Sequence, residues 1–181
     1  MVSSRGRRPR GWGRHQIDPV RVGVVFGSLS PMAQTLTKLL VHCIFSTKDR
    51  ADLIPPEIEE RLYAYIGGVC RGAESDLIGA GGTANHVHLL IKMSKNVALS
   101  DLMMDVKKRS SKWIKTAAPG LGRFGWQDGY AGLTVGQSQV AALHRYLARQ
   151  KRHHAKTTFK QELLEFLEKY EVEYDARYIW D

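Results

Sequence analysis

Residues 86–93, His-Val-His-Leu-Leu-Ile-Lys-Met, constrain the fold of this chain more than any other segment. Successive side chains of a β-strand point to opposite faces of its sheet. One face of this strand therefore carries His86, His88, Leu90 and Lys92, and the other face carries only apolar side chains. The apolar face requires a packed layer of helices, and the histidine face is available for chemistry.

The other periodic segments predict short strands that alternate with amphipathic helices. Strands are expected at 39–45, 76–80, 86–93 and 130–135, and helices at 56–72, 100–115, 138–155 and from 158 onward. This order predicts the α+β class, as a ferredoxin-like sandwich. In it, a small antiparallel sheet has helices on one face, and the other face is free to bind a partner.

The basic surplus of the chain is concentrated at its start. The net charge is +9, and residues 1–31 hold six arginines against one aspartate. Their Arg, Gly, Ser and Pro content without periodicity predicts a disordered leader, followed by a single domain at 32–181. The leader is open to three interpretations: an upstream extension, a translation-start artefact, or an arm that binds phosphates. The charge itself favours a polyanionic partner, either nucleic acid or an anionic membrane surface.

Two further features bear on the compartment. The sequence has no run of about 18 apolar residues, the length that a membrane-spanning helix needs, so no membrane partner is expected. Cys43 and Cys70 are far apart in the sequence and lie in apolar surroundings. This pattern predicts buried free thiols in a reducing compartment such as the cytoplasm.

The histidine pair is a candidate metal site. The imidazoles of His86 and His88 share one strand face, so both can bind the same divalent cation. An isolated His-x-His is more commonly a pair of surface histidines, and the motif needs support from elsewhere in the chain. His42, on the strand at 39–45, is expected to be a packed residue rather than a ligand.

A second candidate is the pair Tyr146 and Gln150, one helical turn apart on the same face. A tyrosine hydroxyl has a pKa near 10 and needs a metal or a base to act as a nucleophile. The glutamine carbonyl can supply a neutral oxygen ligand. Taken alone, the pair is more commonly a tyrosine at the edge of the core. Tyr130, Tyr174 and Tyr178 are rival nucleophiles, but no glutamine follows them one turn later in a clear helix.

Together the two motifs resemble the single-tyrosine HUH-endonuclease transposases of the smallest bacterial insertion sequences, a group that includes the REP-associated tyrosine transposases. The likeness runs from about residue 32 to residue 181. Further motifs fall in order: Ser-Ser-Lys-Trp-Ile at 110–114, Trp-Gln-Asp-Gly-Tyr at 126–130, Gln-Lys-Arg-His-His at 150–154, Thr-Phe-Lys-Gln-Glu at 158–162 and Glu-Tyr-Asp at 173–175. One departure is Asn85, because the residue before the first histidine is often acidic in such proteins.

The resemblance implies the HUH-endonuclease fold and a DNA strand-transfer activity. It implies that His86, His88 and Gln150 hold a divalent cation, Mg²⁺ or Mn²⁺, and that Tyr146 attacks a DNA phosphate to form a phosphotyrosine. The implied substrate is single-stranded DNA with hairpin ends. The implied enzyme is a cytoplasmic, nucleoid-associated homodimer, in which the tyrosine helix of one subunit serves the histidines of the other. Because imidazoles suit softer cations, manganese is expected to bind more tightly than magnesium.

Several side chains are candidates for contacts with DNA phosphates because they are basic and lie on predicted strands or helices. They are Lys92, Lys108, Lys112, Lys115, Lys151, Arg152 and His153. Two alternatives remain beside the transposase. One is a nucleic-acid-binding module without catalysis, and the other is a domesticated relative that cuts genomic hairpin repeats. The second shares the chemistry of a transposase, so only the flanking DNA distinguishes the two.

Overall fold

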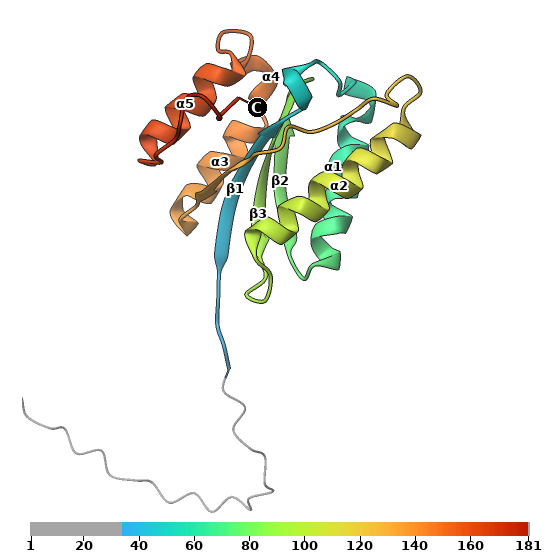
Figure 1. Cartoon of the computed structure of the whole chain (residues 1–181). Coiled ribbons are helices and arrows are strands. Elements are labelled where there is room, and N and C mark those ends of the chain that lie inside the picture. Colours follow the sequence, from blue (N-terminus) through green and yellow to red (C-terminus); the bar gives the residue numbers. More distant parts are fainter. Residues whose placement is uncertain (1–33, 181) are drawn as a thin grey trace, which may run out of the picture. The chain divides into compact units, whose positions relative to one another are not determined.

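One antiparallel sheet forms the centre of the structure, a computed structural model that describes residues 34–180. Its strands are β1 (Leu39–Ser46), β2 (Asp76–Gly82), β3 (His86–Met93) and β4 (Ala131–Thr134), in the order β2-β3-β1-β4. Every neighbouring pair is antiparallel. This arrangement confirms the predicted α+β class with a small antiparallel sheet of ferredoxin-like order (Figure 1). The predicted leader at 1–31 lies outside the described residues.

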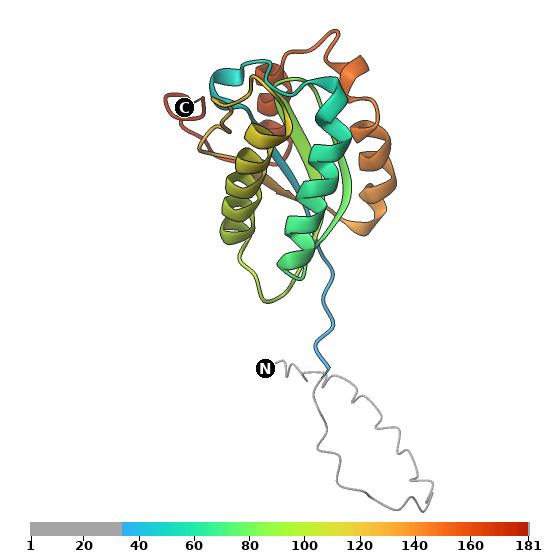
Figure 2. The ribbon, with the colours of Figure 1, turned by 90° about the vertical axis from the view of Figure 1, so that its right-hand side faces the viewer.

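Helices α1 (Pro56–Gly72) and α2 (Leu99–Ala117) cover one face of the sheet. Figure 2 shows the two helices side by side in front of the strands. The covered face consists of the alternate apolar residues of the two central strands, among them Cys43, Phe45, Val87, Leu89 and Ile91. Burial of this face stabilises the fold, because each fully buried aliphatic or aromatic side chain contributes roughly 1.5–3 kcal/mol.

The second face of the sheet is also covered, and here the structure differs from the expectation of a free face. Helices α3 (Val140–Leu147), α4 (Gln150–His153) and α5 (Phe159–Lys169) lie on this side (Figure 1). The physical reason is that this face carries Ile44, Leu90 and other apolar side chains between its histidines, and they are fully buried by the second layer. The sheet face that was predicted to bind a partner is therefore buried inside the protein.

The helix predicted at 138–155 is divided into two pieces. It begins as a 3-10 turn at Gln137–Gln139, continues as α3, and is interrupted before α4. The interruption falls at Arg149, whose φ of −108° and ψ of 7° lie outside the helical range. Leu147 at the end of α3 and Gln150 at the start of α4 are both buried.

Two smaller predictions are confirmed. The Thr158 and Gln161 capping box starts α5: the Gln161 amide donates to the Thr158 hydroxyl, and the Gln161 side-chain oxygen accepts from the Thr158 amide. Cys43 and Cys70 are buried and free. No helix within residues 34–180 is long and apolar enough to cross a membrane.

The close packing of α3 on β2 predicts that a side chain at Gly81 destabilises the fold. A Cβ at this position would overlap the main-chain carbonyl of Leu147, so the helix would have to move away from the sheet. We expect Gly81→Ala to lower the free energy of unfolding by about 1–3 kcal/mol. Urea denaturation measures the change. The control is Gly72→Ala at the end of α1, where a Cβ meets nothing within 4 Å. Equal effects of the two substitutions would contradict the described packing.

Candidate functional site

The two histidines of the His-x-His motif lie in the middle of the second layer. His86 and His88 are fully buried on β3, and their ring centroids are 5.1 Å apart. His42, on the neighbouring strand β1, places its Nε2 atom 3.0 Å from Nδ1 of His88. His42 is therefore a packed histidine, as predicted, and it holds the ring of His88 in place.

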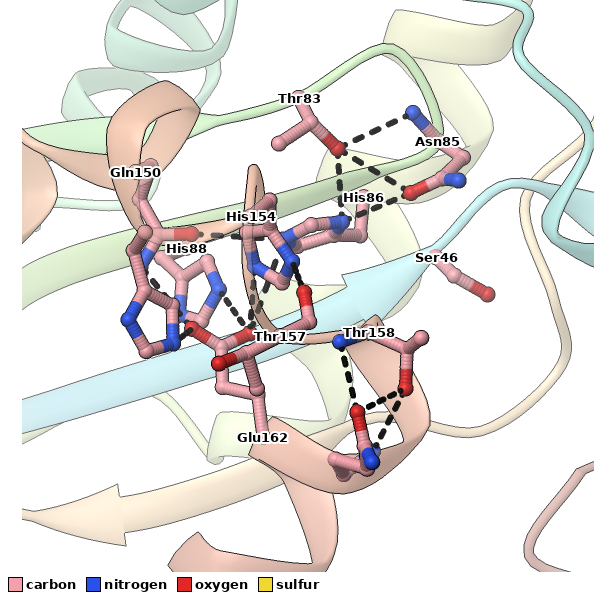
Figure 3. Close-up of polar contacts among 12 residues, drawn as sticks. Ser46, Thr83, Asn85, His86, His88, Gln150, His154, Thr157, Thr158 and Glu162 are labelled. Atoms are coloured by element: carbon pink, nitrogen blue, oxygen red, sulfur yellow. Dashed lines mark hydrogen bonds and ion pairs between the residues drawn. The ribbon is translucent and has the colours of Figure 1, made fainter.

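The loop before β3 orients His86. Nδ1 of His86 lies 2.8 Å from Oδ1 of Asn85 and 2.9 Å from Oγ1 of Thr83 (Figure 3). Its other nitrogen, Nε2, faces Oε1 of Gln150 at 3.4 Å. The amide oxygen of Asn85 therefore takes the orienting position in which an acidic residue was expected from the resemblance. Such a partner fixes the direction in which the second ring nitrogen points.

The carboxylate of Glu162, on α5, joins the elements of the site (Figure 3). Its Oε2 atom lies 3.2 Å from Nε2 of His88 and 3.0 Å from Nε2 of His154. Its Oε1 atom accepts hydrogen bonds from the Tyr146 hydroxyl and from the Gln150 amide, the latter at 3.0 Å. Tyr146 and Gln150, which were predicted to address one point in space, both reach this carboxylate oxygen.

His154 and Glu162 lie within two of the motifs that carry the resemblance described above, at 150–154 and 158–162, but no role was assigned to them from the sequence. With His86 and His88 they form a group whose candidate ligand atoms all lie within 4.8 Å of one another. A signal for Glu162 is present in the sequence. It falls in the apolar stripe of α5, next to Leu163 and one turn after Phe159, where a carboxylate needs buried partners.

Burial and hydrogen bonding set the charges in the site. Burial, and then the neighbouring His88, lower the pKa of His86 to about 3. Burial also lowers the pKa of His88. Burial alone would raise the pKa of Glu162, but hydrogen bonds from His154 and His88 hold it well below its usual range. Burial and the hydrogen bond to Glu162 raise the pKa of Tyr146. At neutral pH the site thus holds neutral imidazoles at His86 and His88, an ionised carboxylate and a protonated phenol.

A basic groove of about 550 Å³ opens beside Tyr146. Besides Tyr146 and His153, its lining includes four exposed cations: Arg145, Arg149, Arg152 and Lys156. None of these cations forms an ion pair with another residue in the described part of the chain. The groove is therefore suited to bind an anion next to the tyrosine.

The predicted basic residues are not all gathered at this groove. Arg152 and His153 line it. Lys92 pairs with Asp76 at 3.1 Å and Lys151 pairs with Glu59 at 2.6 Å.

Lys108, Lys112 and Lys115 are exposed on α2, which covers the sheet face opposite the histidines. The structure therefore separates this lysine stripe from the tyrosine groove.

Comparison with known proteins agrees with this geometry. The family model described as IS200-like transposase matches residues 35–150, well over half of the chain. A solved structure of a candidate transposase from Deinococcus radiodurans R1 is 22% identical, with a TM-score of 0.52 over 67% of this chain and 98% of that one. A REP-associated tyrosine transposase bound to a REP hairpin is 12% identical, with a TM-score of 0.52 over 71% of this chain and 76% of that one. Both likenesses concern the fold. No curated protein matches the sequence.

The buried histidines predict that the metal-free protein loses stability in acid. His86 has a pKa near 3 in the fold and near 6.5 when unfolded, so protons bind the unfolded chain preferentially as the pH falls from 6.5 toward 3. The depressed pKa of Glu162 acts in the same direction below its ordinary value of 4.5. We expect the free energy of unfolding to fall by at least about 2 kcal/mol between about pH 7 and about pH 5.

Urea denaturation in a chelating buffer measures this profile. His86→Asn should make the fall in stability shallower without abolishing it, because the buried ring of His88 remains, whereas His144→Asn, a change at an exposed histidine of α3, should leave the profile unchanged. A wild-type profile that is flat from neutral pH to about pH 5 would contradict the buried, neutral state of these rings.

Proposed function

Because this chain belongs to the IS200-like transposase family, we propose that it is a metal-dependent transposase of single-stranded DNA, which nicks and rejoins a strand through a covalent phosphotyrosine. One observation carries the proposal: Tyr146 and Gln150 meet the buried pair His86 and His88 at a single point, although about sixty residues separate them in sequence. Work on DNA would place the chain in the bacterial cytoplasm, at the nucleoid.

The residues of the site fit a divalent cation. Nδ1 of His86 and Nδ1 of His88 are engaged by neighbours, which leaves both Nε2 atoms directed toward the centre of the cluster. We assign His86, His88 and Gln150 as ligands of Mg²⁺ or Mn²⁺. When bound, the cation would polarise the scissile phosphate and stabilise the charge that develops in the transition state.

Tyr146 supplies the nucleophile. Its hydroxyl is protonated at rest and donates to Oε1 of Glu162, which is therefore the acceptor in place for the proton during attack. The tyrosine oxygen forms a bond to phosphorus, and the bond from phosphorus to the 3′ oxygen breaks. That oxygen takes up a proton and becomes a free 3′-hydroxyl. The phosphotyrosine conserves the energy of the broken linkage, so rejoining to a new 3′-hydroxyl needs no ATP.

We propose single-stranded DNA with hairpin ends as the substrate. The groove beside Tyr146 presents arginines to a sugar-phosphate chain. The structural neighbour bound to a REP hairpin supports a hairpin as the element that is recognised. The same chemistry would serve a domesticated relative that cuts genomic hairpin repeats, and the DNA that flanks the gene distinguishes the two roles.

The subunit arrangement is a separate proposal. The resemblance implies a homodimer whose tyrosine acts in trans. In the described chain, however, Tyr146 contacts Glu162 and His88 of the same chain, with the Tyr146 and His88 ring centroids 5.8 Å apart. We therefore propose that one chain supplies a complete site in cis, whether or not the enzyme is a dimer.

The nucleophile is tested by a covalent-adduct assay on a denaturing gel. Labelled single strands tiled across the DNA that flanks the gene are incubated with Mn²⁺ or Mg²⁺ and the protein. We expect a metal-dependent, upward-shifted band with the wild type and none with Tyr146→Phe, because the phenyl ring lacks the attacking oxygen. Tyr178→Phe, a change at an exposed tyrosine, should form the adduct normally. A tightly bound strand that never forms an adduct would refute the catalytic assignment.

Mixing two inactive variants tests the cis arrangement. Tyr146→Phe lacks the nucleophile, and His88→Ala lacks a proposed metal ligand. If each chain builds its own site, the mixture forms no adduct after co-refolding. If the tyrosine acts in trans, mixed dimers combine one intact tyrosine with one intact histidine pair, and the adduct band returns.

A further inference from the structure

Two side chains of the cluster, the buried Glu162 and the partly buried His154, have no part in the proposed ligand set. His154 follows α4, and Glu162 lies on α5. The ligand atoms of both lie within 4.8 Å of those of His86 and His88. The same two residues are the ones that bring the C-terminal helical segment into the site.

All three imidazoles are oriented in the same way. In each ring Nδ1 is held by a neighbour, and Nε2 points at the Oε2 atom of Glu162. The three Nδ1 atoms contact Oδ1 of Asn85 from His86 (2.8 Å), Nε2 of His42 from His88 (3.0 Å), and the carbonyl of Thr157 from His154 (2.7 Å). The corresponding Nε2 distances to Glu162 are 3.7, 3.2 and 3.0 Å. Histidines that bind metals characteristically donate their other ring N–H in this manner.

This orientation leaves the centre of the cluster short of positive charge. A carbonyl only accepts hydrogen bonds, so Nδ1 of His154 carries a proton that it donates to Thr157. In neutral rings, the Nε2 lone pairs of His86 and His154 then face an ionised carboxylate oxygen. A divalent cation among the donors satisfies all of them.

The second oxygen of Glu162 connects this centre to the nucleophile. While Oε2 faces the imidazoles, Oε1 accepts the hydroxyl of Tyr146 and the amide of Gln150. The side chain of Glu162 is almost completely buried, so water does not replace these hydrogen-bond partners. A cation bound to Oε2 would therefore hold Tyr146 at a set position through the same carboxylate.

We propose that His154 and Glu162 are additional metal ligands, so that three imidazoles and one carboxylate hold the cation together with Gln150, and that Glu162 also positions the hydroxyl of Tyr146. The inference rests on the proposed function only for the role of Tyr146. Three imidazoles and a carboxylate suit divalent transition metals such as Mn²⁺, Co²⁺ or Zn²⁺, whereas Mg²⁺ prefers an all-oxygen site. The proposal thus selects the class of cation as well as its ligands.

Metal titrations without DNA test the ligand set. The chelator-treated protein is titrated with MnCl₂, CoCl₂ and MgCl₂ by calorimetry, and the cobalt complex is followed by its visible absorption. We expect Mn²⁺ and Co²⁺ to bind with much higher affinity than Mg²⁺. Glu162→Gln and His154→Ala should each weaken Mn²⁺ binding by at least about 10- to 100-fold and change the cobalt spectrum. Glu168→Gln and His144→Ala, which alter exposed residues of α5 and α3, should bind as the wild type does.

A measurement on the wild type covers the case in which a buried substitution prevents folding. Nitrogen-15 NMR of the histidine rings during a Zn²⁺ titration should show Nε2 of His154 shifting together with Nε2 of His86 and His88. If the Nε2 resonance of His154 stays in place, or if both site variants bind Mn²⁺ with wild-type affinity, the inference is wrong.

The adduct assay separates failure of this inference from failure of the proposed function. Wild-type metal binding by both variants together with a Tyr146-dependent adduct would reject the extra ligands and keep the transposase. A metal site that includes His154, without any adduct, would keep the ligands and reject the transposase.

Discussion

The buried carboxylate of Glu162 is the interaction on which the second helical layer depends. An ionised carboxylate away from water costs several kcal/mol unless charges and hydrogen bonds compensate it. Its partners come from β3 through His88, from α3 through Tyr146, and from α4 and the residue after it through Gln150 and His154. Docking of α5 therefore requires all of these elements to be in place at once. Loss of any one partner leaves the buried charge less well compensated.

Apolar packing supplies the stability that this polar centre does not. Phe159, Leu163 and Leu167 of α5 pack against Ile44 and Leu133 of the sheet. On the other side of the cluster, the absence of a side chain at Gly81 lets the end of α3 approach β2 closely. The two contacts hold the helices on either side of the histidines, and the hydroxyl of Tyr146 is placed between them as a result.

Sequence patterns predicted those parts of the structure that are determined by neighbouring residues in the chain. The alternation in 86–93 predicted β3 and the shared face of its histidines, because the two-residue period is a property of the strand itself. Segment 138–155 contains no glycine or proline to signal the break at Arg149. The roles of His154 and Glu162 depend on how α5 docks, which is a tertiary property. The position of a carboxylate in the apolar stripe of α5 is a sequence signal for Glu162, but it does not identify the residues that contact it.

The distribution of cations around the sheet has a consequence for how DNA reaches the site. The arginines of the groove come from α3, from the break at Arg149 and from α4, and they line the same groove as Tyr146. In the proposed reaction, a strand positioned for attack would meet them directly. The lysine stripe of α2 covers the opposite face, and the four strands of the sheet lie between the two basic regions. No short segment of a single strand can contact both at once. The arginines of the groove would therefore neutralise phosphates of the reacting strand itself. Contact with Lys108 or Lys112 would require DNA that extends around the edge of the sheet. Under the proposed function, a substrate with a stem beside its single-stranded end would have that reach, whereas a short oligonucleotide would not.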